Sequence, residues 1–365
     1  MYNWQIEKWA EFIYNEEIIS NNALKFAELS GEIFGMFKTF NSAKQQNEIL
    51  DIMISEAIKT SEIEGEMLSR EDVRSSFLKK MGFDSTIKNI KDQRAENIAF
   101  LMLEVRNNFQ EKLTETMLKR WHSILFDKSK YINAGLYRKG DEAMQIVSGA
   151  SGKEKVHYEA PPSAKVPQDM KNFIKWYHRF KTNGNLTKIM IKTAIAHLYF
   201  ESIHPFEDGN GRIGRAIVEK CLSESLEKQI IMSISPTIEK NKNKYYAELK
   251  KAQTTLEINS WLAYFSQLLI DSQQDALDIL NFSVKKTHFF DKYKKIMNDR
   301  QTKAINKMLD AGKDGFEGGM TTKKYISITK TTKATATRDL QELVENGILL
   351  QNLAGRSTNY ALTIS

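Results

Sequence analysis

The sequence predicts a mainly helical protein with one small β-hairpin near its middle and an α+β module at its C-terminal end. Apolar residues recur at steps of three and four along several segments, which is the spacing of one helix face. Two short strand-like runs, 143–147 and 155–161, flank a glycine-containing loop, as in a hairpin. Near the C-terminus, helical segments precede two further strand-like runs, an order typical of a winged helix.

Residues 1–95 form the first of three predicted regions and are helical by pattern. One helix begins near Asn47, and its apolar face comprises Ile49, Ile52, Met53, Ala57 and Ile58. It ends at Gly65, because glycine readily adopts the left-handed conformation that stops a helix. Thr60 and Glu64 are four residues apart and therefore share one face. On pattern alone, the segment 60–65 is a solvated acidic helix end.

The second region, about 96–280, contains the segment HPFEDGNGRIGR at residues 204–215. The apolar spacing predicts a helix over 186–203, which Pro205 interrupts because proline lacks a backbone donor. The Gly209-Asn210-Gly211 turn then leads into a second helix over 212–226. Unpaired N–H groups at a helix start, approached closely where glycine has no Cβ, favour phosphate.

Each polar residue of this segment has a chemical use. His204, with a reference pKa near ~6.5, can take a proton from a hydroxyl at neutral pH. Asp208 is a hard oxygen ligand of the kind that Mg²⁺ shares with substrate phosphates. Arg212 and Arg215 project from one side of the second helix and suit the outer phosphates of a polyphosphate. Phe206 is expected to anchor the loop in the core.

Residues 204–215 resemble the signature of the Fic family, HPFx[DE]GNGRxxR, and match it at every specified position. Most members transfer AMP from ATP to a Ser, Thr or Tyr hydroxyl of a protein and release pyrophosphate. The resemblance implies a helical core, ATP as substrate, Mg²⁺ on Asp208, and His204 as general base. It assigns the nucleotide phosphates to the turn and the start of the second helix, that is to Asp208, Gly209, Asn210, Gly211, Arg212, Ile213, Gly214 and Arg215.

The segment 60–65 resembles a second family motif, [ST]xxxE[GN], of autoinhibited members whose inhibitory helix is N-terminal. Thr60, Glu64 and Gly65 fill its fixed positions. The resemblance implies that Glu64 pairs with Arg215 in the place of the γ-phosphate, so that ATP binds in an unreactive pose. Some such members also remove AMP from their targets, and the sequence leaves that alternative open.

The resemblance also assigns the hairpin and a downstream helix to the nucleotide. In the family, a hairpin at this position covers the nucleotide and pairs with an extended target segment, which implies nucleotide contacts for Ile146, Val147, Ser148 and Gly149. Tyr245 and Gln253 lie in a helix expected over 241–254 and match nucleotide-contacting positions, although the family often has asparagine in place of Gln253. On pattern alone both are structural.

The third region, 290–365, has helical segments over 301–311, 321–328 and 333–346 and strand-like runs over 348–352 and 359–364. In a winged helix the third helix enters the major groove of DNA, where it would present Thr332, Thr335, Thr337 and Arg338. From Lys285 onward there are 15 basic and 8 acidic residues, so the whole net charge of +7 lies in residues 285–365. Two partners remain open: DNA, or protein, including a second copy, since family members commonly form dimers.

Composition sets the broad class. A chain of 365 residues predicts two to three domains, and its single cysteine, Cys221, excludes a disulfide within the chain, as expected in a reducing cytoplasm. No run of eighteen apolar residues is present, and the start MYNWQIEKWAEF is too polar for a signal peptide. We therefore expect a cytoplasmic protein with no membrane partner.

The leading hypothesis is an autoinhibited protein adenylyltransferase that modifies target proteins and itself. One alternative keeps the pocket but removes AMP or transfers another phosphate-containing group. A different class is a DNA-binding regulator whose core senses nucleotide. The intact His204 argues against a pure sensor, because a sensor needs no base.

Overall fold

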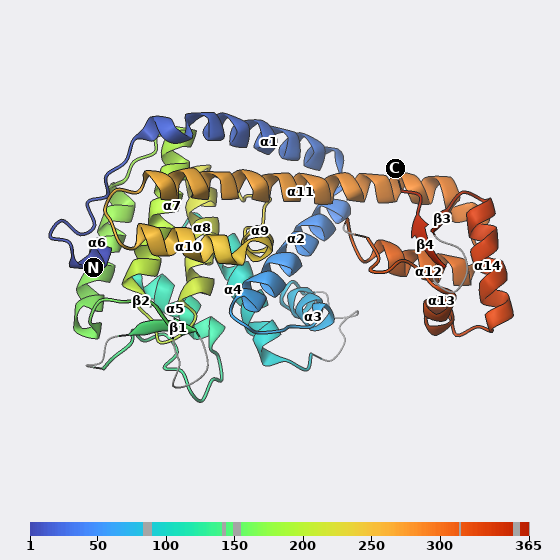
Figure 1. Ribbon diagram of the computed structural model, residues 1–365, viewed down its shortest axis with the longest axis horizontal. Helices are drawn as coiled ribbons and strands as arrows, with labels where there is room; N and C mark the ends of the chain where they lie inside the picture. The colour runs from blue at the N-terminus through green and yellow to red at the C-terminus, as the bar shows by residue number, and fades with distance from the viewer. Residues whose placement is uncertain (83–89, 141–143, 149–154, 314, 353–357, 365) are drawn as a thin grey trace. The chain divides into compact units, whose positions relative to one another are not determined.

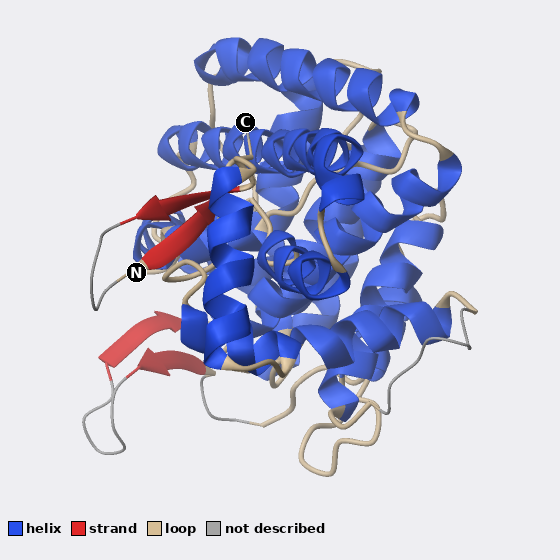
Figure 2. Cartoon of the chain, turned by 90° about the vertical axis from the view of Figure 1, so that its right-hand side faces the viewer, coloured by secondary structure: helices blue, strands red, loops and turns tan. Residues whose placement is uncertain are grey.

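The computed structural model describes residues 1–82, 90–140, 144–148, 155–313, 315–352 and 358–364. The chain divides into two compact units, 1–276 and 277–365, and the predicted boundary near residue 95 lies inside the first. The described residues are mainly helical, and their strands form two antiparallel pairs (Figures 1 and 2). The predicted fold class is confirmed. None of the described helices combines the length and the apolar character needed to span a bilayer.

The first unit is built from ten helices, among the described residues, and the start of an eleventh. Short 3₁₀ turns cover Asn3–Gln5, Glu16–Ile19 and Ser163–Lys165. The helices are α1 (Ser20–Thr39), α2 (Ser42–Ile63), α3 (Arg70–Lys80), α4 (Gln93–Asn107), α5 (Glu115–Leu125), α6 (Val166–Arg179), α7 (Leu186–Ile203), α8 (Asn210–Ser225), α9 (Ser235–Lys240), α10 (Lys242–Ala252) and α11 (Asn259–Tyr293), which continues into the second unit.

Helix α7 is the centre of the first unit. Every residue from Ile189 to Ile203 is buried, so this helix has no solvent face. Helices α1, α6 and α8 pack against it. Cys221 lies on the buried side of α8, as predicted, and is a free thiol. The two helices that carry the segment 204–215 are therefore held rigidly from several sides.

Helix α2 begins at Ser42, earlier than the predicted start near Asn47. The side chain of Asn41 caps it by accepting a hydrogen bond from the Lys44 N–H at 2.9 Å. The first turn is polar, so apolar spacing does not reveal it. The predicted stop is confirmed: Gly65 has a φ of +82°, and the Glu66 N–H donates to the Ser61 carbonyl at 2.9 Å, as in a Schellman motif.

The predicted hairpin is confirmed by β1 (Gln145–Ser148) and β2 (Lys155–Glu159), which pair antiparallel. Gly149 and the rest of the connecting loop, 149–154, lie outside the described residues. Tyr158 anchors the hairpin, because its ring is buried and its hydroxyl donates to the Ser202 carbonyl at 2.6 Å. The hairpin is thus tied to the end of α7, next to His204.

The second unit has the element order of a winged helix. After a 3₁₀ turn, Lys294–Ile296, it comprises α12 (Asp299–Leu309), α13 (Thr322–Thr329), α14 (Lys333–Glu345), β3 (Leu349–Asn352) and β4 (Asn359–Leu362). β3 and β4 pair antiparallel, and Met320 bridges to Tyr360. The buried Asp339 of α14 joins three helices, since it accepts hydrogen bonds from Arg300 of α12 and from the Tyr325 hydroxyl of α13 at 2.9 Å. Residues 353–357, between these two strands, lie outside the described residues.

Candidate active site

His204 caps the C-terminal end of α7. Its backbone is left-handed, with a φ of 50°, and its N–H donates to the Phe200 carbonyl at 3.0 Å. Pro205 follows and prevents another helical turn. The imidazole is mostly buried, and burial together with the charge of Arg138 lowers the pKa of His204 to about 4. The ring is therefore neutral at pH 7 and free to accept a proton.

Arg138 holds the backbone around His204. Its side chain donates to the carbonyls of His204 at 2.7 Å, Pro161 at 2.6 Å and Ile203 at 3.3 Å, and its own N–H donates to the Pro205 carbonyl at 2.9 Å. Carbonyls at a helix end have no partner within the helix, so the buried guanidinium satisfies them and complements the helix dipole. Burial lowers the pKa of Arg138 to about 10, which leaves it charged at neutral pH.

His122 of α5 fixes the next part of the loop. Its Nδ1 accepts a hydrogen bond from the Gly135 N–H at 2.8 Å, which assigns the ring proton to Nε2, 3.2 Å from the Asp208 carbonyl oxygen. Burial lowers the pKa of His122 to about 4, in keeping with this neutral form. The ring stacks on Phe206 with centroids 4.1 Å apart, so the predicted anchoring by Phe206 is confirmed.

The side chain of Asn210 closes the loop on itself. Its Oδ1 accepts from the Phe206 N–H at 2.9 Å and its Nδ2 donates to the Phe206 carbonyl at 2.8 Å. This amide therefore occupies both backbone groups of a residue four positions earlier. The loop conformation is set by side chains, not by the glycines alone.

Helix α8 begins at Asn210, earlier than the predicted Arg212. Gly209, with a φ of +77°, is its N-cap, and the first helical bond joins the Ile213 N–H to the Gly209 carbonyl at 3.0 Å. Among the described residues, the N–H groups of Asn210, Gly211 and Arg212 find no acceptor. The Gly209 N–H is taken by its neighbour Asp208. The N–H groups at the start of α8 that could meet a phosphate are therefore those of residues 210–212.

Arg215 pairs with Glu64, as the motif at 60–65 implies. Arg215 donates from Nη2 to Glu64 Oε1 at 2.7 Å, and from Nε to the Thr60 hydroxyl at 2.6 Å. Burial alone would raise the pKa of Glu64, but the charge and hydrogen bond of Arg215 hold that pKa below its usual value. A Cβ added at Gly211 would lie 2.3 Å from Glu64 Oε1, so the carboxylate lies directly against the first turn of α8.

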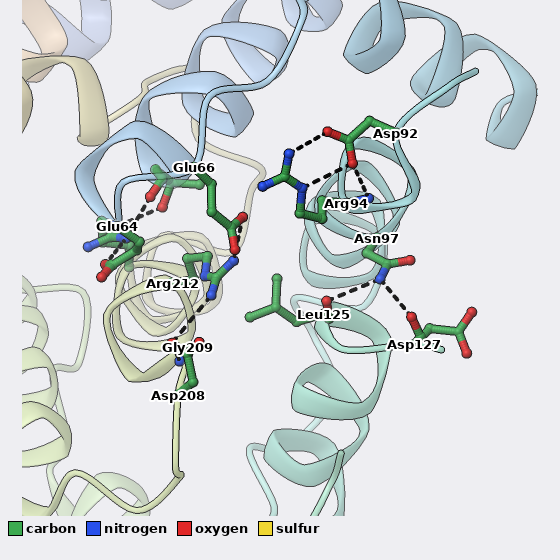
Figure 3. A network of polar contacts seen from close by, with 12 residues as sticks. Glu64, Glu66, Asp92, Arg94, Asn97, Leu125, Asp127, Asp208, Gly209 and Arg212 are labelled. Atoms are coloured by element: carbon green, nitrogen blue, oxygen red, sulfur yellow. Dashed lines mark hydrogen bonds and ion pairs between the residues drawn. The ribbon is translucent and has the colours of Figure 1, made fainter. Parts of the chain in front are cut away.

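Arg212 pairs with a different acid, Glu66, which the sequence did not single out. Its Nη1 donates to Glu66 Oε2 at 2.9 Å and its Nη2 lies 3.5 Å from Asp208 Oδ1 (Figure 3). The guanidinium also lies over the Phe126 ring, 5.2 Å from its centroid. Both arginines of the segment 204–215 thus face carboxylates from the end of α2.

The metal role of Asp208 stays a prediction. Its side chain is half exposed, and within the described part of the chain no cluster of three His, Cys, Asp or Glu side chains converges. A half-exposed carboxylate suits Mg²⁺ that takes its other ligands from phosphates and water. Asp208 would be the protein ligand of an ion bound together with a nucleotide.

Four other predicted nucleotide residues are engaged inside the protein. The Tyr245 ring is buried and its hydroxyl bonds to His197 Nε2 at 2.7 Å, while the Gln253 amide donates to the Glu201 carbonyl at 3.3 Å. Ile213 is a core residue whose N–H is already used, and Gly214 packs against Glu201. The contacts predicted for Tyr245, Gln253 and the β1 residues Ile146, Val147 and Ser148 stay predictions.

Three residues that shape the site were not predicted from the sequence: His122, Arg138 and Glu66. His122 lies in the last turn of α5, and Arg138 lies in a loop. Their hydrogen-bond partners are far along the chain, so the spacing of nearby residues does not reveal these contacts. Glu66 had a weak signal, because it extends the acidic segment Glu62-Ile63-Glu64-Gly65-Glu66 beyond the helix stop. This segment has acids at alternate positions, and the segment 204–215 has two arginines. A second ion pair, besides that of Glu64 with Arg215, was therefore worth considering.

Comparison with known proteins identifies two segments. Residues 112–222 match the Fic/DOC family, and residues 2–83 match a domain of unknown function, DUF4172. The "probable protein adenylyltransferase aq_aa38" of Aquifex aeolicus (strain VF5) is 31% identical over 117 residues, which cover 32% of this chain and 30% of the Aquifex protein. The chain therefore matches less than a third of that relative's length.

Solved structures show the same fold. A Fic family protein from Desulfovibrio desulfuricans G20 superposes with a TM-score of 0.51 at 19% identity, covering 93% of this chain and 96% of that one. A Fic domain containing signaling protein from Bacteroides thetaiotaomicron VPI-5482 gives a TM-score of 0.55 at 19% identity, covering 70% of this chain and 97% of that one. The first of these likenesses extends over nearly the whole chain, and the architecture is the mainly helical Fic fold with a small C-terminal antiparallel sheet.

Proposed function

Because residues 112–222 make up a Fic/DOC family domain, we propose that this chain is a protein adenylyltransferase. It would transfer AMP from ATP to Ser, Thr or Tyr hydroxyls of target proteins and of itself. One observation carries the proposal: the neutral imidazole of His204 and the unpaired N–H groups of residues 210–212 lie at the two ends of one short loop. A base and an anion-binding helix end are thereby held at fixed separation.

The proposed reaction is a substitution at the α-phosphorus of ATP. His204 takes the proton of the target hydroxyl while that oxygen bonds to phosphorus. The bond from phosphorus to the bridging oxygen breaks, and pyrophosphate leaves with the electron pair. The N–H groups of 210–212 and the charge of Arg215 are suited to the phosphates. Mg²⁺ held by Asp208 would neutralise charge on the phosphates and on the leaving pyrophosphate.

We propose that Glu64 restrains this reaction. Its carboxylate engages Arg215 at 2.7 Å and lies against Gly211, at the start of α8 where a phosphate would approach. Arg215 is almost fully buried, and its Nε and Nη2 already donate to Thr60 and Glu64. A phosphate gains Nη2 of Arg215 only when Glu64 gives it up.

Substitution of Glu64 tests the proposal. Glu64→Gly should raise AMP transfer about tenfold or more, the equivalent of about 1.4 kcal/mol in the barrier. Label from ATP marked at the α-phosphorus, with Mg²⁺ present, should appear on the protein and should be lost when His204→Ala is added. Glu62→Gly is the matched control, because Glu62 lies on the same helix end but pairs with Lys59 at 2.6 Å.

The outcomes separate the alternative functions. Equal labelling of wild type and Glu64→Gly would contradict the restraint. Transfer of label from the γ-phosphorus would indicate another group, and loss of AMP from a modified protein would indicate removal. Tight ATP binding without any label would favour a nucleotide sensor.

A second function rests on the surface of α14. Its buried face packs Ala336, Leu340 and Leu343 into the core of the second unit, whereas Lys333, Thr337 and Arg338 are exposed. Thr332 and Thr335 bond to each other at 3.0 Å at the helix start. A helix that exposes Lys333, Thr337 and Arg338 in its first half, after a helix and a short turn, suits the groove and phosphates of duplex DNA. We propose DNA as a partner of this unit.

A further inference from the structure

The end of α2 supplies one carboxylate to each arginine of the segment 204–215. Glu64 accepts from Arg215 at 2.7 Å, and Glu66 accepts from Arg212 at 2.9 Å. The two acids are separated only by Gly65, whose left-handed φ of +82° ends the helix. The two arginines lie three residues apart on α8 and therefore on one side of it.

We infer that Glu66 is a second restraining carboxylate, which competes with a phosphate of the nucleotide for Arg212. The inference rests on the proposed function, since it takes a polyphosphate to be the ligand at the start of α8. On this account Glu64 withholds Arg215 and Glu66 withholds Arg212. Removing Glu64 alone releases only one of the two arginines.

Arg212 has little capacity left for a phosphate while Glu66 is in place. Its side chain is 4% exposed, its Nη1 serves Glu66, and its Nη2 is directed to Asp208 at 3.5 Å. Its Nε is buried and has no hydrogen-bond partner among the described residues. A fork-shaped contact to a phosphate needs two adjacent donors. Because Nε is buried, the forked edge open to a phosphate is the one formed by Nη1 and Nη2, and there the phosphate competes with Glu66 for Nη1.

The Glu66 carboxylate would remain near water and a positive charge if it moved away from Arg212. Its side chain is 23% exposed, and Arg94 of α4 lies on its other side (Figure 3). Arg94 bonds to Asp92, and that bond, together with the nearby charges of Asp92 and Glu66, raises the pKa of Arg94 above its usual value. Moving away from Arg212 would therefore not leave Glu66 as an isolated buried charge.

A positioning role for Glu66 makes the opposite prediction. If Glu66 only oriented Arg212 for the nucleotide, its removal would weaken ATP binding. If Glu66 competes with phosphate, its removal strengthens ATP binding. The sign of the change in affinity therefore decides between the two roles.

Glu66→Gln removes the charge and keeps the size of the side chain. By isothermal titration calorimetry with ATP and Mg²⁺, we expect its Kd to fall about tenfold, equivalent to about 1.4 kcal/mol. Glu62→Gln, which removes a charge paired with Lys59 on the same helix, should bind ATP like the wild type. In an Arg212→Ala background, Glu66→Gln should leave the Kd for ATP unchanged, because no guanidinium remains for Glu66 and the phosphate to compete for. Melting temperatures without nucleotide establish that each variant is folded.

An unchanged or higher Kd for Glu66→Gln would overturn the inference. If Glu66→Gln tightens ATP binding but Glu64→Gly/Glu66→Gln transfers no AMP, the competition stands and the adenylyltransferase proposal fails. If Glu64→Gly transfers AMP while Glu66→Gln leaves ATP affinity unchanged, the reverse holds. If ATP binds to none of these folded variants, both proposals are wrong.

Discussion

Gly214 sets how closely α8 approaches α7 below the site. A Cβ at this position would lie 2.2 Å from Glu201 Oε1 and 3.2 Å from His197 Cε1, and both of those side chains are buried on α7. The backbone of Gly214 is ordinary helix, so glycine is needed here for space and not for a special φ. The contact therefore depends on the absence of a single methyl group.

Gly214→Ala should destabilise the first unit by roughly 1–3 kcal/mol, because the clash with Glu201 outweighs the better helix propensity of alanine. Gly35→Ala is the matched control: Gly35 is exposed on α1 and an added Cβ meets nothing within 4 Å, so that variant should gain about 0.5–1 kcal/mol. Urea unfolding followed by tryptophan fluorescence measures both. Equal stability of Gly214→Ala and wild type would mean that the two helices can move apart at little cost.

The chemical roles of residues in the segment 204–215 were predictable from the sequence, whereas the residues that hold this segment in place were not. His204, Asp208 and the arginines could be assigned roles because each role follows from the side chain and from near neighbours in sequence. Arg138 acts on Pro161 and His204, and His122 acts on Asp208, which is 86 positions away. Such contacts depend on the packing of α5 against α8, and no local pattern encodes that packing.

At the scale of elements, apolar spacing located buried helices well and polar ends poorly. The predicted range 186–203 coincides with α7, since a fully buried helix begins at a cap and ends at a proline. The first turn of α2 was missed because its polar residues are held by the Asn41 cap and not by core packing. The C-terminal order of helices and strands was predicted because the glycines between residues 312 and 319, and Gly347, mark the breaks between its elements.

The exposed face of α14 makes a prediction about ionic strength. If this helix meets DNA, the logarithm of the association constant falls with the logarithm of salt concentration by about 0.9 for each phosphate neutralised. Lys333→Ala and Arg338→Ala should each reduce that slope by about one. Lys303→Ala removes an equal charge from the exposed side of α12 and should leave the slope unchanged.

Fluorescence anisotropy of a labelled duplex, titrated with the full chain over a series of salt concentrations, measures this slope. Lack of binding at low salt would exclude DNA as the partner. Binding with a slope that Lys333→Ala and Arg338→Ala leave unchanged would assign the contact to another surface. Protein contact would then be the better hypothesis for α14.

At the scale of the whole chain, titration of buried groups is concentrated in the first unit. Burial lowers the pKa values of His122, His197 and His204 to about 4 each, whereas it raises those of Glu201 to about 8 and Glu219 to about 7. The histidines take up protons more readily when unfolded, and the two acids more readily when folded. The two sets therefore act on stability with opposite sign as pH changes.

His197 isolates one of these contributions. A histidine with a folded pKa near 4 and an unfolded pKa near ~6.5 gives its full stabilisation above pH 6.5, and loses it as pH falls toward 4. Between pH 6 and pH 5 the wild type should therefore lose about 1.2 kcal/mol more stability than His197→Gln, which does not titrate. Glutamine retains a hydrogen-bonding partner for the Tyr245 hydroxyl.

All five tryptophans of the chain lie at or before residue 261, so fluorescence-detected urea unfolding reports on the first unit alone. The difference between wild type and variant cancels the contributions of Glu201, Glu219 and the other two histidines, which both proteins share. If the difference in unfolding free energy stays constant from pH 6 to pH 5, His197 either takes up a proton in the folded protein or is already protonated at pH 6. In that case the neutral, buried arrangement beneath the site does not hold, and the same doubt extends to the neutral imidazole of His204.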